Sequence, residues 1–358
     1  EPPMIALRSG PMHLRGIAQR GFSLVELMVA MLIGLFVLGG GLAVFLGGHQ
    51  SFRTNEGAAR LQENARMGFE VFSRDLRQAG GNACGTSRVA SALNNPGTHW
   101  GTDWSAGPIQ GVAASVASPT GAAQATGTAA AARVSGTPAV ILRHASDDGN
   151  ALTIEFSNSS GHLQVTKGSD HGLKQGDIVM ACSPSHAIIF QKTSNNTNQQ
   201  IQRGTGNNVS PGNCSNSGFD YVAPPNCPTT GDASQLAGGY LVRVGAAFWY
   251  VGHNDRGGRS LYRQGLIGPG TNTERVEMVE GVHDMRLSYL VEGQSAYLNA
   301  DHATFAANAA LWQQVVAIRV ELDMVSQEQV GVTATGQQQA LQRTVRFTVR
   351  LRNAGGER

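Results

Sequence analysis

The stretch that decides the fold is Arg20-Gly21-Phe22-Ser23-Leu24-Val25-Glu26-Leu27, and an apolar run continues it to Gly48. No charged side chain occurs in the sequence from Leu27 to Gly48. An α-helix needs about 20 apolar residues to cross the hydrocarbon core of a bilayer, and this run has that length. Because a charge inside a bilayer is costly, Glu26 near the start of the run needs a functional reason. The sequence therefore predicts a membrane helix that carries one carboxylate at its beginning.

The residues Gly21-Phe22-Ser23-Leu24-Val25-Glu26 resemble the class III signal of type IV prepilins and pseudopilins. The resemblance implies that a prepilin peptidase cuts after Gly21 and that the new N-terminal residue, Phe22, is methylated. It also implies that Glu26 pairs with the N-terminal amine of a neighbouring subunit during assembly.

Residues 1–21 are accordingly expected to be the prepilin leader, with Met12 as a candidate start. Arg15 and Arg20 are expected to hold this end in the cytoplasm, as positive charges do beside membrane helices. An ordinary secretory signal is cut after its apolar region. Here the expected cut precedes the apolar run, so residues 22–48 stay in the mature protein as the membrane and assembly half of a long helix.

Residues 49–81 are expected to continue that helix as an amphipathic half. Apolar residues recur there at spacings of three and four, which predicts one buried stripe. Charges of alternating sign follow the opposite face, and Gly80-Gly81 is a C-terminal stop signal. The stripe consists of Leu61, Ala65, Phe69, Phe72, Leu76 and Ala79.

Composition favours a loop-rich, exported β protein. Charged residues make up only 15% of the 358 residues, and there are 46 glycines. The net charge of +2 gives no electrostatic footprint for nucleic acid, so no nucleic-acid partner is expected. The four cysteines, Cys84, Cys182, Cys214 and Cys227, allow two disulfides in three connectivities, which suits an oxidising periplasm.

Residues 82–358 are predicted to form a β-rich periplasmic head. Two parts of it are expected to be loops: the Ala/Gly-rich tract 111–136, taken as a flexible surface excursion, and the Asn-rich stretch 193–227, taken as flexible or disulfide-tied. The fold class is α+β, with the long N-terminal helix packed on a mainly antiparallel sheet. The expected strands are 139–143, 152–156, 162–166, 177–182, 187–191, 239–244, 246–251 (the last two joined tightly), 260–264, 285–291, 315–325 and 343–351.

No sequence motif of an enzyme, cofactor site or metal site is found. The sequence lacks a Gly-x-Ser-x-Gly elbow, a P-loop and a His-Glu-x-x-His pair, so no enzymatic activity is expected. The acidic segments 147–150 and 299–302 are interpreted as turns rather than calcium sites. For the tryptophans, Trp100, Trp104, Trp249 and Trp312, core or edge packing is expected rather than a sugar-binding platform. The histidines are expected to lie at the surface: His144, His162, His171, His186 and His253.

The head also resembles the PilW family of minor pilins. The segments that carry this resemblance are 74–81 with Cys84, 176–179 with Cys182, 189–191, 261–263, 278–282 and 316–320. Family order implies a Cys84–Cys182 disulfide, which leaves Cys214 to pair with Cys227. The two loop regions match the family pattern least.

The resemblance implies a structural protein that primes type IV pilus assembly and is incorporated at or near the pilus tip. Its expected partners are companion minor pilins, the major pilin, the prepilin peptidase, the inner membrane with its assembly platform, and a tip adhesin. Its expected location is the inner membrane with a periplasmic head, followed by the extracellular pilus. Two alternatives remain open at this point: a minor pseudopilin of a type II secretion system, and a pilus-borne adhesin or DNA-binding tip protein.

Overall fold

The computed structural model describes residues 21–82, 84–119, 121, 123–146, 151–157, 162–166, 171–195, 199–205, 208–333 and 337–353. Two expected segments lie outside the described residues: the leader up to Arg20, with Met12 and Arg15, and the turn 147–150. The chain forms two compact units that divide between Asn55 and Glu56. This division falls a few residues after the expected boundary between residues 48 and 49.

Helix α1 (Leu24–Gln78) is long, and its exposure to solvent changes along its length. In the first unit its side chains are mostly exposed, whereas from Leu61 onward it buries the predicted stripe. Phe69 is the exception, because it lies at the rim of the packed face and meets the Phe347 ring edge-on at 5.0 Å. Gly80 follows the helix with a φ of +73°, the left-handed conformation that glycine adopts most easily after a helix.

Two further contacts attach the end of α1 to the head. The Gly80 N–H donates to the Arg143 carbonyl at 2.8 Å, and the Ala145 N–H donates to the Gly81 carbonyl at 2.6 Å. The exposed face of the same helix carries the expected ion pairs at a spacing of four residues, from Glu56 to Arg60 and from Arg66 to Glu70. The predicted amphipathic half is therefore a packed helix with one solvated face.

The larger sheet of the head is built around one long strand, β9 (Tyr240–His253). Its other strands are β1 (Val89–Ser91), β2 (Ile109–Val112), β3 (Ala139–Ala145), β4 (Leu152–Ser157), β5 (His162–Val165), β6 (Ile178–Cys182), β7 (Ala187–Gln191), β8 (Gln200–Gln202), β10 (Arg259–Leu266) and β11 (Thr273–Glu280). Within the described residues the order is β1-β7-β6-β9-β4-β5-β8, with β3 and β10 also on β9, β2 on β3 and β11 on β10. These pairs are antiparallel except β1 with β7.

β9 corrects one sequence prediction, because it is one strand where two strands joined by a tight turn were expected. Its first part pairs with β4 and β6, and its later part pairs with β3 and β10. Gly245, the residue between the two expected strands, lies inside β9 under the His144 ring. A Cβ at Gly245 would lie 2.6 Å from His144 Cε1, so this glycine allows close packing.

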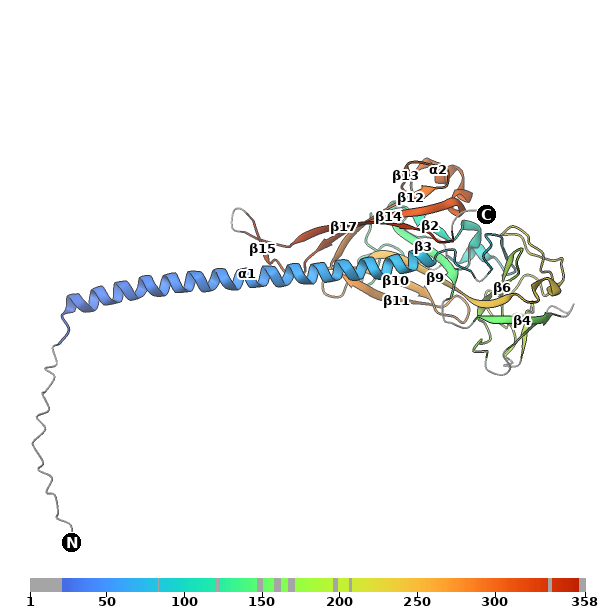
Figure 1. The fold of residues 1–358 in the computed structure, drawn as a ribbon, viewed down its shortest axis with the longest axis horizontal. Coiled ribbons are helices and arrows are strands. Elements are labelled where there is room, and N and C mark those ends of the chain that lie inside the picture. The colour runs from blue at the N-terminus through green and yellow to red at the C-terminus, as the bar shows by residue number, and fades with distance from the viewer. Residues whose placement is uncertain are drawn as a thin grey trace, which may run out of the picture. The chain divides into compact units, whose positions relative to one another are not determined.

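A second sheet has the order β13-β12-β14-β17 among the described strands. Figure 1 shows β14 and β17 on one side of the later part of α1 and β10 and β11 on the other. Side chains from α1, from β9 and β10, and from β12, β14 and β17 form one apolar core. The remaining elements are β12 (Val282–Val291), β13 (Tyr297–Leu298), β14 (Val315–Val325), β15 (Gly331–Val332), β16 (Gln338–Gln339), β17 (Gln342–Arg350), α2 (Ala303–Ala307) and the short 3-10 helices η1 (Pro96–Thr98), η2 (Trp104–Ala106), η3 (Ala233–Leu236) and η4 (Ala309–Gln314).

The expected α+β class, a long helix packed with a mostly antiparallel sheet, is confirmed. Of the two expected loop regions, the tract 111–136 differs from its prediction, whereas the stretch 193–227 is tied by the Cys214–Cys227 disulfide as expected. In the tract 111–136, Ala123, Ala132 and Val134 are buried against the sheet, because small side chains let the backbone pack closely. The stretch 193–227 contains β8 and the buried Phe219.

Candidate functional site

The first turn of α1 is closed by a reciprocal pair of hydrogen bonds between Ser23 and Glu26. The Ser23 backbone N–H donates to Glu26 Oε2 at 3.0 Å, and the Glu26 N–H donates to Ser23 Oγ at 3.2 Å. This capping box satisfies two of the backbone donors that a helix N-terminus leaves open. Gly21 and Phe22 immediately precede it and are exposed. The geometry places the Glu26 carboxylate beside the start of the helix.

Glu26 keeps capacity for a second partner. The residue is exposed, and an ionised carboxylate offers about four lone-pair sites on its two oxygens. The printed bond to the Ser23 N–H uses one of these sites. An ammonium group approaching the N-terminal turn can therefore bind Glu26 without breaking the capping box.

The segment of α1 that follows Glu26 exposes its apolar side chains. Within the described residues, α1 is the one helix that is long and apolar enough to cross a membrane. Leu32, Leu35, Phe36, Gly39 and Gly40 line a shallow hollow of about 340 Å³ on this segment, because the two glycines leave no side chain there. Such a surface is unsuited to water and fits lipid or the helices of other subunits.

A buried carboxylate anchors the later part of α1 in the head. Asp75, only 4% exposed, accepts the indole N–H of Trp249 at 3.1 Å and the Nε–H of Arg263 at 2.6 Å. Both donors come from the large sheet, on β9 and β10. A buried charge is tolerated where it is paired and hydrogen-bonded, as it is here. Phe72, one turn earlier, packs against the Trp249 ring at 4.9 Å.

Two disulfides fasten the head. Cys84, six residues after the end of α1, is bonded to Cys182 at the end of β6, with a Cα–Cα distance of 4.9 Å. Cys214 is bonded to Cys227, with a Cα–Cα distance of 6.2 Å. This is the pairing that the family resemblance implies.

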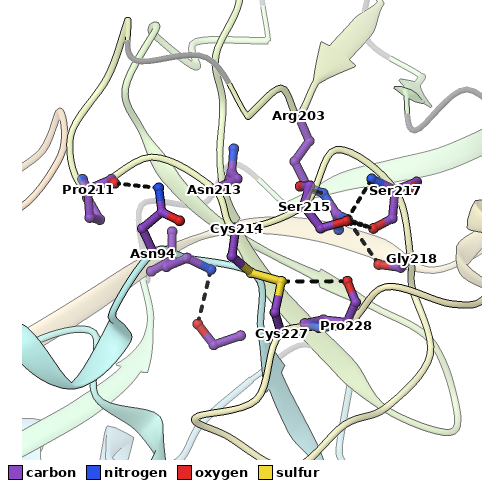
Figure 2. The surroundings of a disulfide bond; sticks show 12 residues. Asn94, Arg203, Pro211, Asn213, Cys214, Ser215, Ser217, Gly218, Cys227 and Pro228 are labelled. Carbon is purple, nitrogen blue, oxygen red and sulfur yellow. Dashed lines mark hydrogen bonds between the residues drawn. A yellow bond between two sulfur atoms is a disulfide. The ribbon is translucent and has the colours of Figure 1, made fainter.

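The surroundings of the second disulfide are organised by a buried arginine, as Figure 2 shows. Arg203 donates to the carbonyls of Ser215, Ser217 and Gly218, and its guanidinium lies 4.5 Å from the centre of the Phe219 ring. Burial lowers the pKa of Arg203 to about 10, so its charge persists at neutral pH. These contacts hold the Cys214 loop in place and offer no reactive group.

Comparisons with known proteins agree with this arrangement. The model described as prokaryotic N-terminal methylation motif matches residues 17–42, and the model described as type IV pilus-assembly protein W matches residues 248–353. Together these matches support a type IV pilus minor pilin with a prepilin methylation signal, and the pilus-assembly match covers about a third of the chain. The methylation motif and the single apolar helix fit an anchor in the inner membrane.

A curated relative of the chain is the pilin-like protein PilA3 of Thermus thermophilus. The two are 33% identical over 78 residues, which is 22% of this chain and 34% of the relative. The match thus spans about a third of that protein's length. No solved structure matches the chain.

The histidines of the head are not all at the surface, contrary to expectation. His144, His171 and His186 are buried, while His162 and His253 are half-buried. They serve as packed polar side chains within the loops and sheet. Across the described segments, no group of three or more His, Cys, Asp or Glu side chains is placed to hold a metal ion.

The role of Ser23 at the first turn of α1 was not predicted from the sequence. Its signal was present, because a serine followed three residues later by a glutamate, just before an apolar run, is the pattern of a capping box. Glu26 was singled out from that pattern only for its charge. The structure brings Ser23 and Glu26 together at the first turn of α1, as the two hydrogen bonds show.

Proposed function

We propose that this minor pilin primes the assembly of a type IV pilus and is then incorporated at or near its tip. The prepilin peptidase cuts between Gly21 and Phe22, and the new amine of Phe22 is methylated. Glu26 then binds the N-terminal amine of a neighbouring subunit. The head lies in the periplasm while the helix is in the inner membrane, and it reaches the cell exterior with the pilus.

The observation that carries this proposal is the placement of an exposed carboxylate at the first turn of an exposed apolar helix. Among packed apolar helices an unpaired carboxylate is costly, and removing that cost requires an ammonium at one defined position. The attraction is therefore specific for one axial register between subunits. Glu26 supplies this register, and the following apolar side chains supply the packing area.

The partners in this proposal are companion minor pilins, the major pilin and the inner-membrane assembly platform. The match of residues 248–353 to the pilus-assembly family supports the pilus over a type II secretion pseudopilus. A tip adhesin is a further partner in this arrangement. The role is structural, and no group in the site acts as a catalyst.

Glu26→Gln and Ser23→Ala separate the charge from the helix cap in one experiment. Glutamine serves in a capping box as glutamate does, so Glu26→Gln keeps the first turn and removes the charge. We expect subunit association about ten- to a hundredfold weaker, since a charge-assisted bond is worth roughly 1.5–3 kcal/mol. Ser23→Ala costs the cap about 1 kcal/mol. The Ser23→Ala variant should therefore keep most of its pili. For both variants, pili are counted by shearing and electron microscopy in a strain that lacks its own copy of the gene.

Processing is read in the same strains as the shift of the chain on a gel. Both variants should be cut normally, whereas Gly21→Val should accumulate as the longer, uncut form. Normal piliation with Glu26→Gln would refute the register role. Equal loss of pili in the two variants would instead assign the defect to the helix terminus.

A further inference from the structure

A cavity of about 190 Å³ opens in the head beside β2 and β3. We call it the β2 pocket and define it by Trp100, Asp103, Gln110, Gly111, Val112, Ala113, Val116, Pro119, Ile141, Arg143 and Ala300. Its volume equals that of about six water molecules in the liquid. Val116 is 40% exposed, which places it at the mouth of the pocket. Nothing in the role proposed for α1 uses this space.

Arg143 is the buried cation of the pocket. Its side chain is fully buried, and it donates to the carbonyls of Trp100 at 2.7 Å and Gly107 at 2.8 Å and to Gln110 Oε1 at 2.9 Å. All three of these acceptors are uncharged. A guanidinium carries five N–H donors, so these three hydrogen bonds leave two N–H donors for a further partner. Arg143 is thus positioned firmly and still has donor capacity.

Two polar atoms, one on the pocket-lining Trp100 and one on Tyr289 beside the lining residue Gly111, have no partner among the described residues. The indole Nε1 of Trp100 and the hydroxyl of Tyr289 are buried without a hydrogen bond within the described part of the chain. The Tyr289 hydroxyl lies against Gly111, where an added Cβ would meet it at 2.7 Å. Buried polar atoms in native proteins are almost always paired with protein, water or a ligand. The unpaired indole N–H on the pocket-lining Trp100 therefore fits a polar occupant of the cavity.

Asp103 and Gln110 supply the acceptors at the same pocket. Asp103 Oδ1 accepts a hydrogen bond from Ser105, which fixes the carboxylate. Asp103 and Arg143 both line the pocket, and the negative charge of Asp103 acts against the effect of burial on the pKa of Arg143. The pocket therefore combines one cation and one anion with neutral donors and acceptors. The balance disfavours a strongly charged ligand of either sign.

We propose that the β2 pocket binds one hydroxylated sugar ring at the end of a glycan. Hydroxyl groups donate and accept, so one ring can bind both the donors of Arg143 and Trp100 and the carboxylate of Asp103. Val112, Pro119 and Ile141 give apolar walls for the carbon face of the ring, as in small-molecule sites in general. The volume admits a single ring, and the exposed mouth leaves room for the rest of the glycan outside.

Ligand-observed NMR on the full-length processed chain in a zwitterionic detergent without sugar groups tests the proposal. The probes are free D-glucose, D-galactose, D-mannose and N-acetyl-D-glucosamine, each titrated separately. At least one should show saturable transfer of magnetisation from the protein. Asp103→Asn should weaken that binding about tenfold, because a hydrogen bond to a charged group is lost.

Val116→Trp closes the mouth of the pocket, and Val276→Trp is its matched control. Val276 is also an exposed valine, at 44%, and lies on β11 away from the residues that define the pocket. Sugar binding should disappear in Val116→Trp and persist in Val276→Trp. The proposal is overturned if none of the four sugars saturates, if Val116→Trp binds as the wild type does, or if acetate binds where the sugars do not. The assay needs no pilus, so its failure would leave the assembly role of Glu26 intact.

Discussion

Glu26 shows how one side chain can meet two requirements at once. Within the single chain its carboxylate accepts the Ser23 N–H and completes the first turn of α1. A carboxylate near a helix N-terminus is also favoured by the helix dipole. The same side chain still has free lone pairs for an amine from outside. A residue that looks costly in an apolar segment is thus stabilised locally before any partner arrives.

His99 should make the head less stable as the pH falls. Burial, together with the neighbouring positive charge of Arg143, lowers the pKa of His99 from 6.5 to about 4. Between these pH values the unfolded chain binds more protons than the folded chain, so the free energy of unfolding decreases as the pH decreases. The contribution is at most about 1.4 kcal/mol per pH unit. Urea midpoints across this range measure it.

The comparison for this effect is His99→Asn, whose amide oxygen can still accept the Gly101 N–H that His99 Nδ1 accepts at 3.1 Å. The variant should lose part of the slope of midpoint against pH. The pKa values of Glu321 and Asp323 are lowered chiefly by hydrogen bonds from Arg286, so these two groups also reduce stability as the pH falls. Their contribution is the same in the wild type and in His99→Asn, and it cancels in the difference between the two slopes. Identical slopes would contradict the assignment to His99.

At the scale of elements, the later half of α1 is held by an apolar stripe and by Asp75 within it. Asp75→Asn removes the negative charge that pairs with Arg263 and weakens the acceptor for Trp249. Breaking a buried pair costs about 3–5 kcal/mol. Because the Arg263 side chain is 30% exposed, we expect a loss of roughly 2 kcal/mol in the free energy of unfolding. Chemical unfolding followed by circular dichroism measures it.

Glu70→Gln on the outer face of the same helix is the control for Asp75→Asn. Glu70 pairs with Arg66 in an exposed ion pair one turn apart, and exposed pairs often contribute nothing measurable. The control should unfold like the wild type. If Asp75→Asn does so as well, the anchor is supplied by the apolar stripe alone.

Elements with a regular pattern were predictable, and those that depend on distant partners were not. The stripe of α1 follows from its spacing, and Asp75 could have been placed on it, since it lies three residues after Phe72. That it would meet Trp249 and Arg263 could not be read from the helix alone. In the same way, the local sequence around Gly245 does not show that β9 continues through it. The reason for a glycine there is the His144 ring, which comes from a strand about 100 residues earlier.

The Ala/Gly tract 111–136 was misjudged for a related reason. Its side chains are too small to build a core by themselves, which favoured a loop. They instead complete a core that the strands supply, with Ala123 and Ala132 buried and Arg133 fully buried among them. The β2 pocket lies partly along this tract. Its polar lining comes from segments that are separated in sequence, so no local motif predicts the pocket.

At the scale of the whole molecule, the two disulfides should stabilise the head unequally. Cys84 and Cys182 are separated by 98 residues, whereas Cys214 and Cys227 are separated by 13. In the chain-entropy model, removing the first costs about 4–5 kcal/mol and removing the second about 3 kcal/mol. The double variants Cys84→Ala/Cys182→Ala and Cys214→Ala/Cys227→Ala should rank in that order by urea unfolding. The opposite order, or other pairs in non-reducing peptide maps, would contradict this.

The α+β class followed from the sequence because it rests on a long helix and on many alternating strands. The sheet order did not, since β9 pairs with strands before and after it in the chain. The signal around Gly21 was local and could be read directly. The lining of the β2 pocket depends on residues that only the fold brings together, such as Trp100, Asp103 and Arg143.

The Cys84–Cys182 bond has a mechanical consequence. Tension along α1 would reach the head through the packed stripe from Leu61 onward and through the end of the helix. There, the hydrogen bonds of Gly80 and Gly81 with Arg143 and Ala145 join the helix to β3. Six residues after the helix, the covalent bond joins Cys84 to the end of β6, so a second strand of the same sheet shares the load. The disulfide keeps the end of α1 tied to the sheet even if the two hydrogen bonds to β3 break.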